Sequence, residues 1–105
     1  MNDRILGMVG LAVRAKRASL GVFLTEKALD EGRCELVIMA EDIGLSNKRR
    51  IENKCLEWDV PFIFHTDKNT LSHSVGKKDM PVLGILDHGF AEAIIKLKNN
   101  GGADK

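Results

Sequence analysis

The sequence predicts an α/β fold, a three-layer α-β-α sandwich in which a small, mostly parallel and partly mixed sheet lies between two layers of helices. Helical and strand-like segments alternate along most of the chain, which is typical of such a sheet. Residues 36–40 form an unbroken apolar run, as expected of a strand in a sheet that is covered on both faces. The length of 105 residues suits one domain with one hydrophobic core.

The first helix is predicted over residues 3–14, with Asp3 or Asn2 available to cap its start. Its apolar residues recur at helical spacing, namely Ile5, Leu6, Val9, Ala12 and Val13. A short connecting segment, 17–20, then leads to Gly21.

The second helix is predicted from Val22 to about Glu31, where Gly32 ends it as a left-handed cap. One face of this helix carries Val22, Thr25, Ala28 and Leu29. The apolar run 36–40 follows and is expected to be the central strand.

The third helix is predicted from Ser46, a suitable N-cap, to Asp59, because Pro61 prevents its continuation. Its apolar positions are Ile51, Cys55, Leu56 and Trp58, with basic residues on the other faces. A short strand over 62–64 comes next.

The last elements are a short helix over 68–75 that Gly76 closes, a strand over 82–86 that Pro81 opens, and an amphipathic helix over 89–98. This helix is expected to bury Phe90, Ile94, Ile95 and Leu97. Residues 1–98 are therefore expected to form a single domain, and 99–105, rich in Gly and Asn, a flexible tail.

The formal net charge is only +1, from 16 basic and 15 acidic residues, but the basic side chains gather in three places. These groups are Arg14, Lys16 and Arg17; Lys48, Arg49, Arg50 and Lys54; and Lys77 with Lys78. A nearly neutral protein can still present a local basic face. For the group from Lys48 to Lys54, a solvated helix face is the favoured interpretation.

The two cysteines, Cys34 and Cys55, do not suggest a disulfide framework and are expected to be small core residues. The apolar runs are far shorter than the ~20 residues of a membrane span. We therefore expect a cytoplasmic protein without a membrane segment.

The loops by which common α/β enzymes bind nucleotides are absent from the sequence. No pair of glycines has the spacing of a dinucleotide-binding turn, and Gly76 with Lys77 lacks the residues that would complete a phosphate-binding loop. We therefore expect no nucleotide cofactor.

His65, His73 and His88 fall in three different elements and are expected at the surface rather than around a metal ion. Glu41 and Asp42 follow a strand, where they either support acid–base chemistry or simply cap or solvate a turn. The second interpretation is favoured, so no catalytic residue, metal or cofactor is expected.

Several stretches of the sequence, taken in order, resemble one protein family. They are Gly21 to Lys27, Ala28-Leu29, Gly32, the string Leu36-Val37-Ile38-Met39-Ala40-Glu41-Asp42, Cys55, Val60-Pro61 and Leu71 to Gly76. The chain looks like the L-seven-Ae type of ribosomal protein, above all its small bacterial homologues, over residues 1–98. This resemblance implies an α-β-α sandwich that binds kink-turns, sharply bent RNA motifs built on tandem sheared G·A pairs.

The resemblance also implies an RNA surface in two parts. The first is the start of the second helix, with Gly21, Val22, Phe23, Leu24 and Lys27. The second is the loop before the last strand, with Lys77, Lys78, Asp79 and Met80. The basic residues Arg14, Lys16 and Arg17 are expected to flank this surface.

Within the first part, Gly21 allows close approach to a helix N-terminus, where free N–H groups can bind a phosphate, and Lys27 lies on the same face. Phe23 and Leu24 stand where the family commonly has Asn and Glu, which hydrogen-bond guanine edges. Phe23 either stacks on an exposed base or belongs to the core.

The sequence thus favours a monomeric, non-enzymatic RNA-binding protein that is ribosomal or ribosome-associated and recognises structured RNA of the kink-turn kind, with rRNA as one candidate. The alternative is a protein–protein interaction module, for which exposed Phe23, Leu24 and Met80 would be suited. A small enzyme using Glu41 and Asp42 is the least favoured interpretation.

Overall fold

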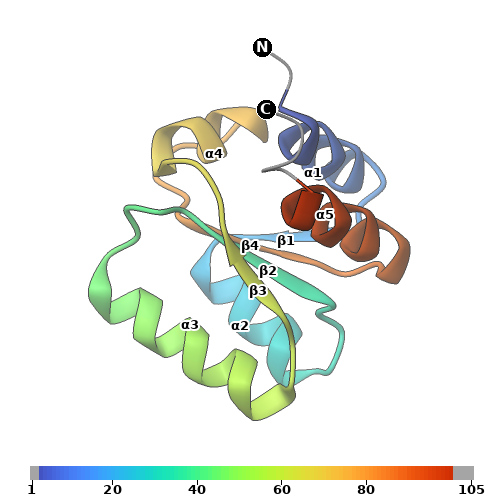
Figure 1. Ribbon diagram of the computed structural model, residues 1–105. Coiled ribbons are helices and arrows are strands. Elements are labelled where there is room, and N and C mark those ends of the chain that lie inside the picture. The colour runs from blue at the N-terminus through green and yellow to red at the C-terminus, as the bar shows by residue number, and fades with distance from the viewer. Residues whose placement is uncertain (1–2, 101–105) are drawn as a thin grey trace.

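The computed structural model describes residues 3–100, which fold into five helices and four strands (Figure 1). The helices are α1 (Arg4–Arg14), α2 (Val22–Asp30), α3 (Leu45–Trp58), α4 (Lys68–Ser74) and α5 (His88–Asn100). The strands are β1 (Ala18–Leu20), β2 (Leu36–Met39), β3 (Phe62–Phe64) and β4 (Val82–Ile85). The alternative cap Asn2 and residues 101–105 of the expected tail lie outside the described residues.

The strands form one sheet in the order β1-β4-β2-β3. β2 pairs in parallel with β3, with Val37 opposite Phe62, whereas β4 runs antiparallel to β1 and to β2. The predicted α/β class, the mixed sheet and the inner position of β2 are confirmed. The expectation that parallel pairs predominate is wrong, because two of the three neighbouring pairs are antiparallel.

β4 is antiparallel because the chain does not return across the sheet after β3. The amide of Glu41 donates to the carbonyl of Thr66 at 2.8 Å, and the amide of Ala40 donates to the carbonyl of Pro81 at 2.7 Å. The C-terminal end of β3 and the N-terminal end of β4 therefore lie on the same side of the sheet as the C-terminal end of β2. α4 has only seven residues, about 10 Å at 1.5 Å per residue, and stays on this side.

β1 was expected to be only a connection, and it is an edge strand of three residues. Ala18, Ser19 and Leu20 pair with Ile85, Gly84 and Leu83 of β4. A strand of this length is too short to show a recognisable alternation of apolar and polar residues, which is why the sequence did not reveal it.

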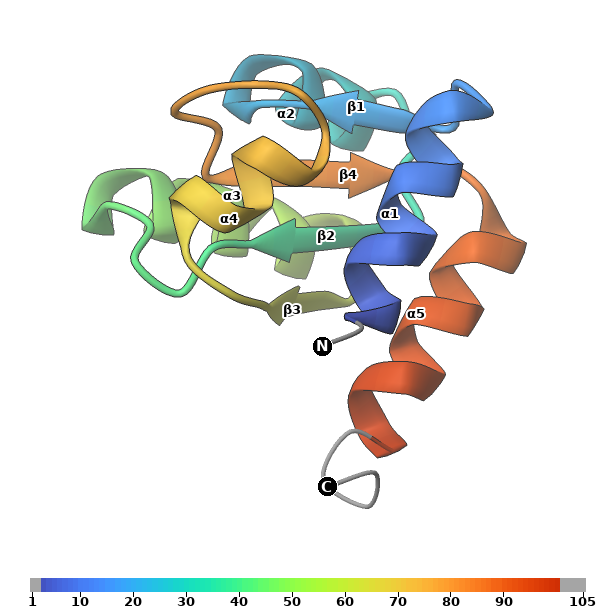
Figure 2. The same ribbon diagram turned by 90° about the horizontal axis from the view of Figure 1, so that it is seen from above.

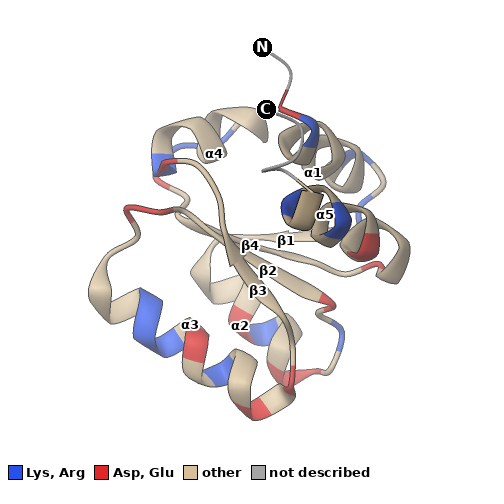
Figure 3. Cartoon of the chain, in the orientation of Figure 1, with Lys and Arg blue, Asp and Glu red and all other residues tan. Residues whose placement is uncertain are grey.

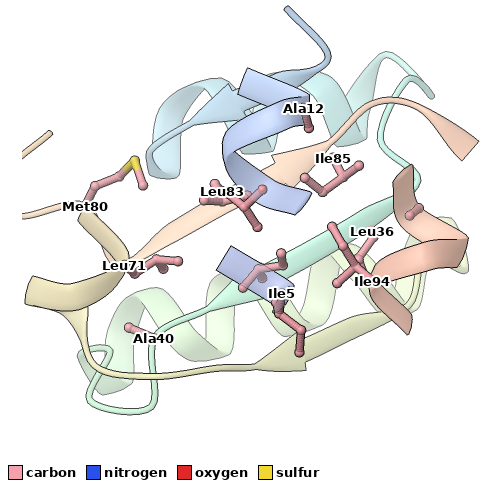
Figure 4. Close-up of a cluster of buried hydrophobic side chains, with 12 residues drawn as sticks. Ile5, Ala12, Leu36, Ala40, Leu71, Met80, Leu83, Ile85 and Ile94 are labelled. Carbon is pink, nitrogen blue, oxygen red and sulfur yellow. The ribbon is translucent and has the colours of Figure 1, made fainter. Parts of the chain in front are cut away.

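The helices cover both faces of the sheet, which confirms the three layers (Figure 1). α1, α4 and α5 lie on one face over a core that includes Ile5, Val9, Leu71, Leu83 and Ile94 (Figure 4). α2 and α3 lie on the other face over a core that includes Leu29, Val37, Ile51, Cys55 and Val82. Both cysteines are buried and free, as expected.

Gly84, in the middle of β4, allows α2 to pack closely on the sheet. A Cβ atom at this position would lie 3.4 Å from Thr25 Cγ2 of α2, and only 2.7 Å from Ser19 Oγ and 2.9 Å from Cys34 Sγ. Ser19 Oγ is also 3.3 Å from Thr25 Oγ1 in a buried hydrogen bond that joins β1 to α2. These contacts fix the start of α2 at the end of β1.

The predicted start of α1 is confirmed, since Asp3 Oδ1 accepts a hydrogen bond from the amide of Leu6 at 3.0 Å. The start of α3 differs from the prediction, because Gly44 is the N-cap and makes no side-chain hydrogen bond. Ser46 therefore lies in the first turn of α3. At the other end, Asp59 has a left-handed backbone (φ 57°) and ends the helix before Pro61.

α3 buries fewer residues than its apolar pattern suggested. Ile51 and Cys55, four positions apart, are fully buried. Leu56 is 73% exposed and Trp58 is 43% exposed, because only a narrow stripe of this outer helix faces the sheet.

α5 starts at His88, where the carboxylate of Asp87 accepts a hydrogen bond from the amide of Phe90 at 2.9 Å. It ends at Asn100, past the expected end at Lys98. Ile94 is buried, and the other three predicted residues, Phe90, Ile95 and Leu97, pack half-buried against the same core.

Candidate nucleic-acid interface

A groove with a volume of about 760 Å³ lies at the end of the sheet where β1 and β2 finish and β4 begins. Its lining includes seven of the residues that the resemblance implied, namely Gly21, Val22, Leu24, Lys77, Lys78, Asp79 and Met80. Figure 2 shows the loop between α4 and β4 at the same end of the sheet as the tip of β1. The two predicted parts of the surface therefore form two walls of one groove.

The first wall is the start of α2, and Gly21 sets its geometry. Gly21 has φ 94° and ψ 169°, a conformation that a residue with a Cβ adopts only with strain. Its amide donates to the carbonyl of Val82 at 2.9 Å, which holds the helix start against β4. No side chain of the described residues caps α2, so its first-turn amides remain available for an anion.

Two further predicted residues, Phe23 and Lys27, lie on the exposed face of α2 next to the groove rather than in its lining. The side chain of Phe23 is 75% exposed, which rules out the interpretation of this ring as a core residue. Lys27 follows Phe23 by four positions and is also exposed, so the two side chains neighbour each other on the helix. Leu24, 47% exposed, links this face to the groove.

The second wall is the loop of residues 76–80 between α4 and β4. Gly76 (φ 71°) and Asp79 (φ 52°) both have left-handed backbones, which produce its tight course. The loop is fixed by buried Ser72, whose Oγ accepts a hydrogen bond from the amide of Met80 at 2.8 Å and lies 2.7 Å from the carbonyl of Lys68. Lys77, Lys78 and Asp79 are exposed.

Met80 corrects one expectation, since its side chain is only 5% exposed and belongs to the core beneath α1 and α4 (Figure 4). Only Pro81 separates it from the inner strand β4, and at the base of the loop its side chain turns inward. Met80 is thus a floor residue of the groove and not an exposed apolar contact.

Seven residues of the groove lining had no predicted binding role, namely Ala18, Leu20, Asp42, Gly44, Asn47, Lys68 and Pro81. Gly44 caps α3 without a side-chain bond, so a second helix begins at the groove. Lys68 Nζ lies 3.5 Å from Asp79 Oδ1, an ion pair between α4 and the loop. Each of these residues stands alone in the sequence without a motif, so only the fold reveals that they come together.

The two acidic residues that follow β2 have different surroundings in the structure. Asp42 Oδ1 accepts a hydrogen bond from the amide of Lys68 at 2.8 Å and so helps to cap α4, which is the favoured interpretation of the pair. Glu41 is exposed and lies by a smaller hollow that Lys48 and Phe64 also line.

The basic group Arg14, Lys16 and Arg17 does not flank the groove, contrary to expectation. The carbonyl of Arg17 accepts a hydrogen bond from the amide of Leu86 at 2.8 Å, which places this group beside the far end of β4. In Figure 2 the turn from α1 to β1 lies at the opposite end of β1 from the start of α2. Since β1 separates them, closeness in sequence to Gly21 did not bring these residues to the groove.

Three basic residues of α3 contact residues of the neighbouring α2 and β3. Arg50 pairs with Glu26, Lys54 Nζ lies 2.9 Å from Asp30 Oδ1, and the ammonium of Lys48 lies 5.5 Å from the centre of the Phe64 ring. The hydrogen bond from Lys54 lowers the pKa of Asp30 below its usual value. Figure 3 shows acidic residues interspersed with the basic ones on α3, as on a solvated helix face.

The two thiols are buried, and the three histidines differ in their exposure. Burial raises the pKa of Cys34 to about 11 and that of Cys55 to about 12, so both thiols stay protonated near neutral pH. His73 and His88 are exposed as expected, whereas His65 is half-buried and its Nε2 lies 2.9 Å from Asp3 Oδ2.

Within residues 3–100, no group of three or more His, Cys, Asp or Glu side chains is placed to hold a metal ion. In the same part of the chain, none of the helices has the length and apolar character needed to span a membrane.

The chain has recognisable relatives. A model of the ribosomal protein L7Ae/L30e/S12e/Gadd45 family matches residues 3–95. The RNA-binding protein YlxQ of Bacillus subtilis is 31% identical over 90 residues, which cover 86% of this chain and 90% of YlxQ. The large ribosomal subunit protein eL8 of Thermoplasma volcanium is 25% identical over 97 residues, covering 91% and 80% of the two chains. The solved structure of a Bacillus halodurans protein of unknown function is similar with a TM-score of 0.88 at 28% identity, covering 93% and 99%.

Proposed function

The chain belongs to the ribosomal protein L7Ae/L30e/S12e/Gadd45 family, and on this basis we propose that it is a non-enzymatic RNA-binding protein that recognises structured RNA of the kink-turn kind. YlxQ is named an RNA-binding protein and eL8 a large ribosomal subunit protein, which supports RNA as the partner and the ribosome as one place of action. The proposal includes a cytoplasmic monomer that acts alone on its RNA.

The groove between α2 and the loop of residues 76–80 is the observation that carries this proposal. Lys68, Lys77 and Lys78 line it, and the uncapped start of α2 adds free backbone N–H groups. Cations and helix N-terminal amides are the groups that bind phosphate oxygens without regard to sequence. A concave surface of this kind suits a sharp bend, where phosphates from two RNA strands come close together.

The acidic residues and thiols do not support a catalytic alternative. Asp42 is engaged with the amide of Lys68, and the two thiols are buried and protonated. The groove therefore offers groups that position an RNA and no activated nucleophile or base.

The test is a comparison of two RNAs in a binding assay at one salt concentration. We expect micromolar or tighter binding to a kink-turn RNA and much weaker binding to a plain duplex of equal length. The double variant Lys77→Ala, Lys78→Ala should lose most of this difference, whereas Lys96→Ala, at an exposed position of α5, is the matched control and should retain it. Equal affinity of the protein for the two RNAs would contradict the proposal.

A protein–protein interaction module remains the second candidate, because Phe23 and Leu24 present apolar surface at 75% and 47% exposure. The near-neutral charge of the chain also fits a protein partner. Recovery of the tagged protein from lysate with and without ribonuclease separates the two functions, since only a direct protein complex survives the nuclease.

A further inference from the structure

Phe23 differs from the other phenylalanines of the chain in its surroundings. Phe62, Phe64 and Phe90 pack against the two cores, whereas the ring of Phe23 is 75% exposed on the first turn of α2. Single exposed apolar residues are common on protein surfaces, so exposure by itself indicates no role. Its position matters more, because the ring stands beside a groove lined by lysines.

Cationic groups lie on the same helix as this ring and in the lining of the neighbouring groove. Lys27 follows one helical turn later on the same face of α2, and Lys77 and Lys78 belong to the opposite wall of the groove. A planar aromatic ring flanked by such charges is the combination that binds unpaired nucleotides, since the base stacks on the ring while neighbouring phosphates contact the cations. An RNA strand fits this face better than an apolar protein segment, which would leave the ammonium groups without counter-charges.

The same region of α2 offers no side chain that could read the edge of a base. Gly21, Val22, Phe23 and Leu24 carry no hydrogen-bonding side-chain group. The next two polar side chains are buried and engaged, since Thr25 bonds to Ser19 beneath the helix and Glu26, 8% exposed, pairs with Arg50 of α3. A base on Phe23 would meet a π face and apolar surface, and the donors that this helix still offers, the ammonium of Lys27 and the uncapped first-turn amides, are the groups expected to bind phosphates.

From these three observations we propose that Phe23 is a stacking residue for one unpaired base of the bound RNA, and that the site accepts this base whatever its identity. The inference rests on the proposed RNA-binding function and adds to it a rule of specificity. RNA shape and phosphate positions select the partner, and the base on Phe23 contributes affinity without sequence information.

The experiment uses one kink-turn RNA in five forms that differ at a single unpaired nucleotide of the bend: A, G, C, U or an abasic sugar. Each unpaired position of the bend is tested in turn. At one of them we expect the four bases to bind within about threefold of one another and the abasic RNA to bind on the order of 10- to 100-fold more weakly, as expected for the loss of one stacked base. The fluorescent base 2-aminopurine at that position should be quenched on binding.

Variants of Phe23 test whether the base at this RNA position stacks on the Phe23 ring. Phe23→Ala should bind every intact RNA about as weakly as the wild-type protein binds the abasic one, and should lose nothing further on the abasic RNA. Phe23→Tyr keeps the ring and should keep the affinity, whereas Phe23→Leu should behave like Phe23→Ala. Leu56→Ala, at a residue 73% exposed on α3, is the matched control and should change neither affinity nor melting temperature.

Several results would overturn the inference while leaving RNA binding in place: a preference above tenfold for one base at the position that Phe23 contacts, equal binding of intact and abasic RNA at every position, or unchanged affinity of Phe23→Ala. Unchanged RNA affinity together with loss of a ribonuclease-resistant complex from lysate would assign Phe23 to a protein partner. Failure of the wild-type protein to bind any of the RNAs would overturn the proposed function and this inference with it.

Discussion

Lys27 carries its charge on the exposed face of α2, one turn from the groove, where a backbone phosphate is its expected partner. Lys27→Ala should weaken binding by ~1 kcal/mol, equally for every RNA that the protein binds, and should lower the salt dependence by about one counterion. Titrations of two or three different bent RNAs at several salt concentrations measure both effects. A loss confined to one sequence would show instead that Lys27 contacts a base.

Asp79 places a carboxylate in a groove that is otherwise suited to phosphates. Its Oδ1 lies 3.5 Å from Lys68 Nζ, so it competes with a bound phosphate for this cation. Asp79→Asn should therefore tighten RNA binding about two- to fivefold, because an exposed ion pair worth ~0.2 to 1 kcal/mol no longer competes for Lys68 and a negative charge is removed. Asn also tolerates the left-handed backbone at this position. The gain should shrink in a Lys68→Ala background, and weaker binding by Asp79→Asn would contradict this account.

Individual residues were predictable from the sequence to different degrees. The left-handed cap predicted at Gly32 is observed, and Gly76, which was predicted to close α4, also has a positive φ, whereas the positive φ of Gly21 at a helix start was not predictable. The burial of Met80 was not predictable, because a Met shortly before a strand can point toward the core or toward solvent, depending on where the loop lies. The place of Lys68 in the groove was not predictable either, because it depends on the path that the chain takes from β3 into α4.

At the scale of elements, Ser72 of α4 holds the loop that forms one wall of the groove. Ser72→Ala should destabilise the fold by ~1 to 3 kcal/mol, because the buried amide of Met80 loses its acceptor, and should also weaken RNA binding as Lys77 and Lys78 become less ordered. Thermal melts and binding curves measure the two effects. Ser74→Ala is the control, since its hydroxyl bonds only to Leu71 within the same helix, and equal melting temperatures for the two variants would refute the role of Ser72.

Asp3 joins the start of α1 to His65, which follows β3. Burial raises the pKa of this carboxyl, but the hydrogen bonds from Leu6 and His65 outweigh it, and the pKa lies below its usual 3.8. A lowered pKa means that the ionised form stabilises the folded state, so this stabilisation is present above about pH 4 and is lost as the pH falls through the folded-state pKa. Urea unfolding should show Asp3→Asn to be less stable than the wild type at pH 7, and this difference should shrink as the pH falls below about 4. A constant difference across this range would exclude the charge as the cause.

Elements longer than about seven residues were predicted well, because their apolar spacing extends over two or more turns. The three-residue β1 was missed, and the start of α3 was placed at Ser46 because a hydroxyl is a common cap, whereas Gly44 takes that place. The direction of β4 depends on the end of the sheet at which the short α4 delivers the chain, and no local sequence pattern indicates this.

For the whole molecule, the net charge of +1 limits long-range attraction to RNA, so binding should depend on a few local contacts. The log–log slope of affinity against salt should be about two to four, at ~0.7 to 0.9 per phosphate contact from the lysines in and beside the groove. Affinity measured between low and physiological salt checks this value. A slope near zero would indicate that apolar contacts, and not phosphates, hold the RNA.

β4 comes last in the chain among the strands of residues 3–100 and yet lies between β1 and β2 in the sheet. During synthesis, β1 and β2 emerge early but have no neighbour in common until the chain has passed residue 85, so the sheet cannot close before then. The groove needs the same late event, because Gly21 of its first wall is held by Val82. A nascent chain should therefore be unable to capture RNA until its final helix is being made, and cleavage between α4 and β4 should abolish folding and binding together.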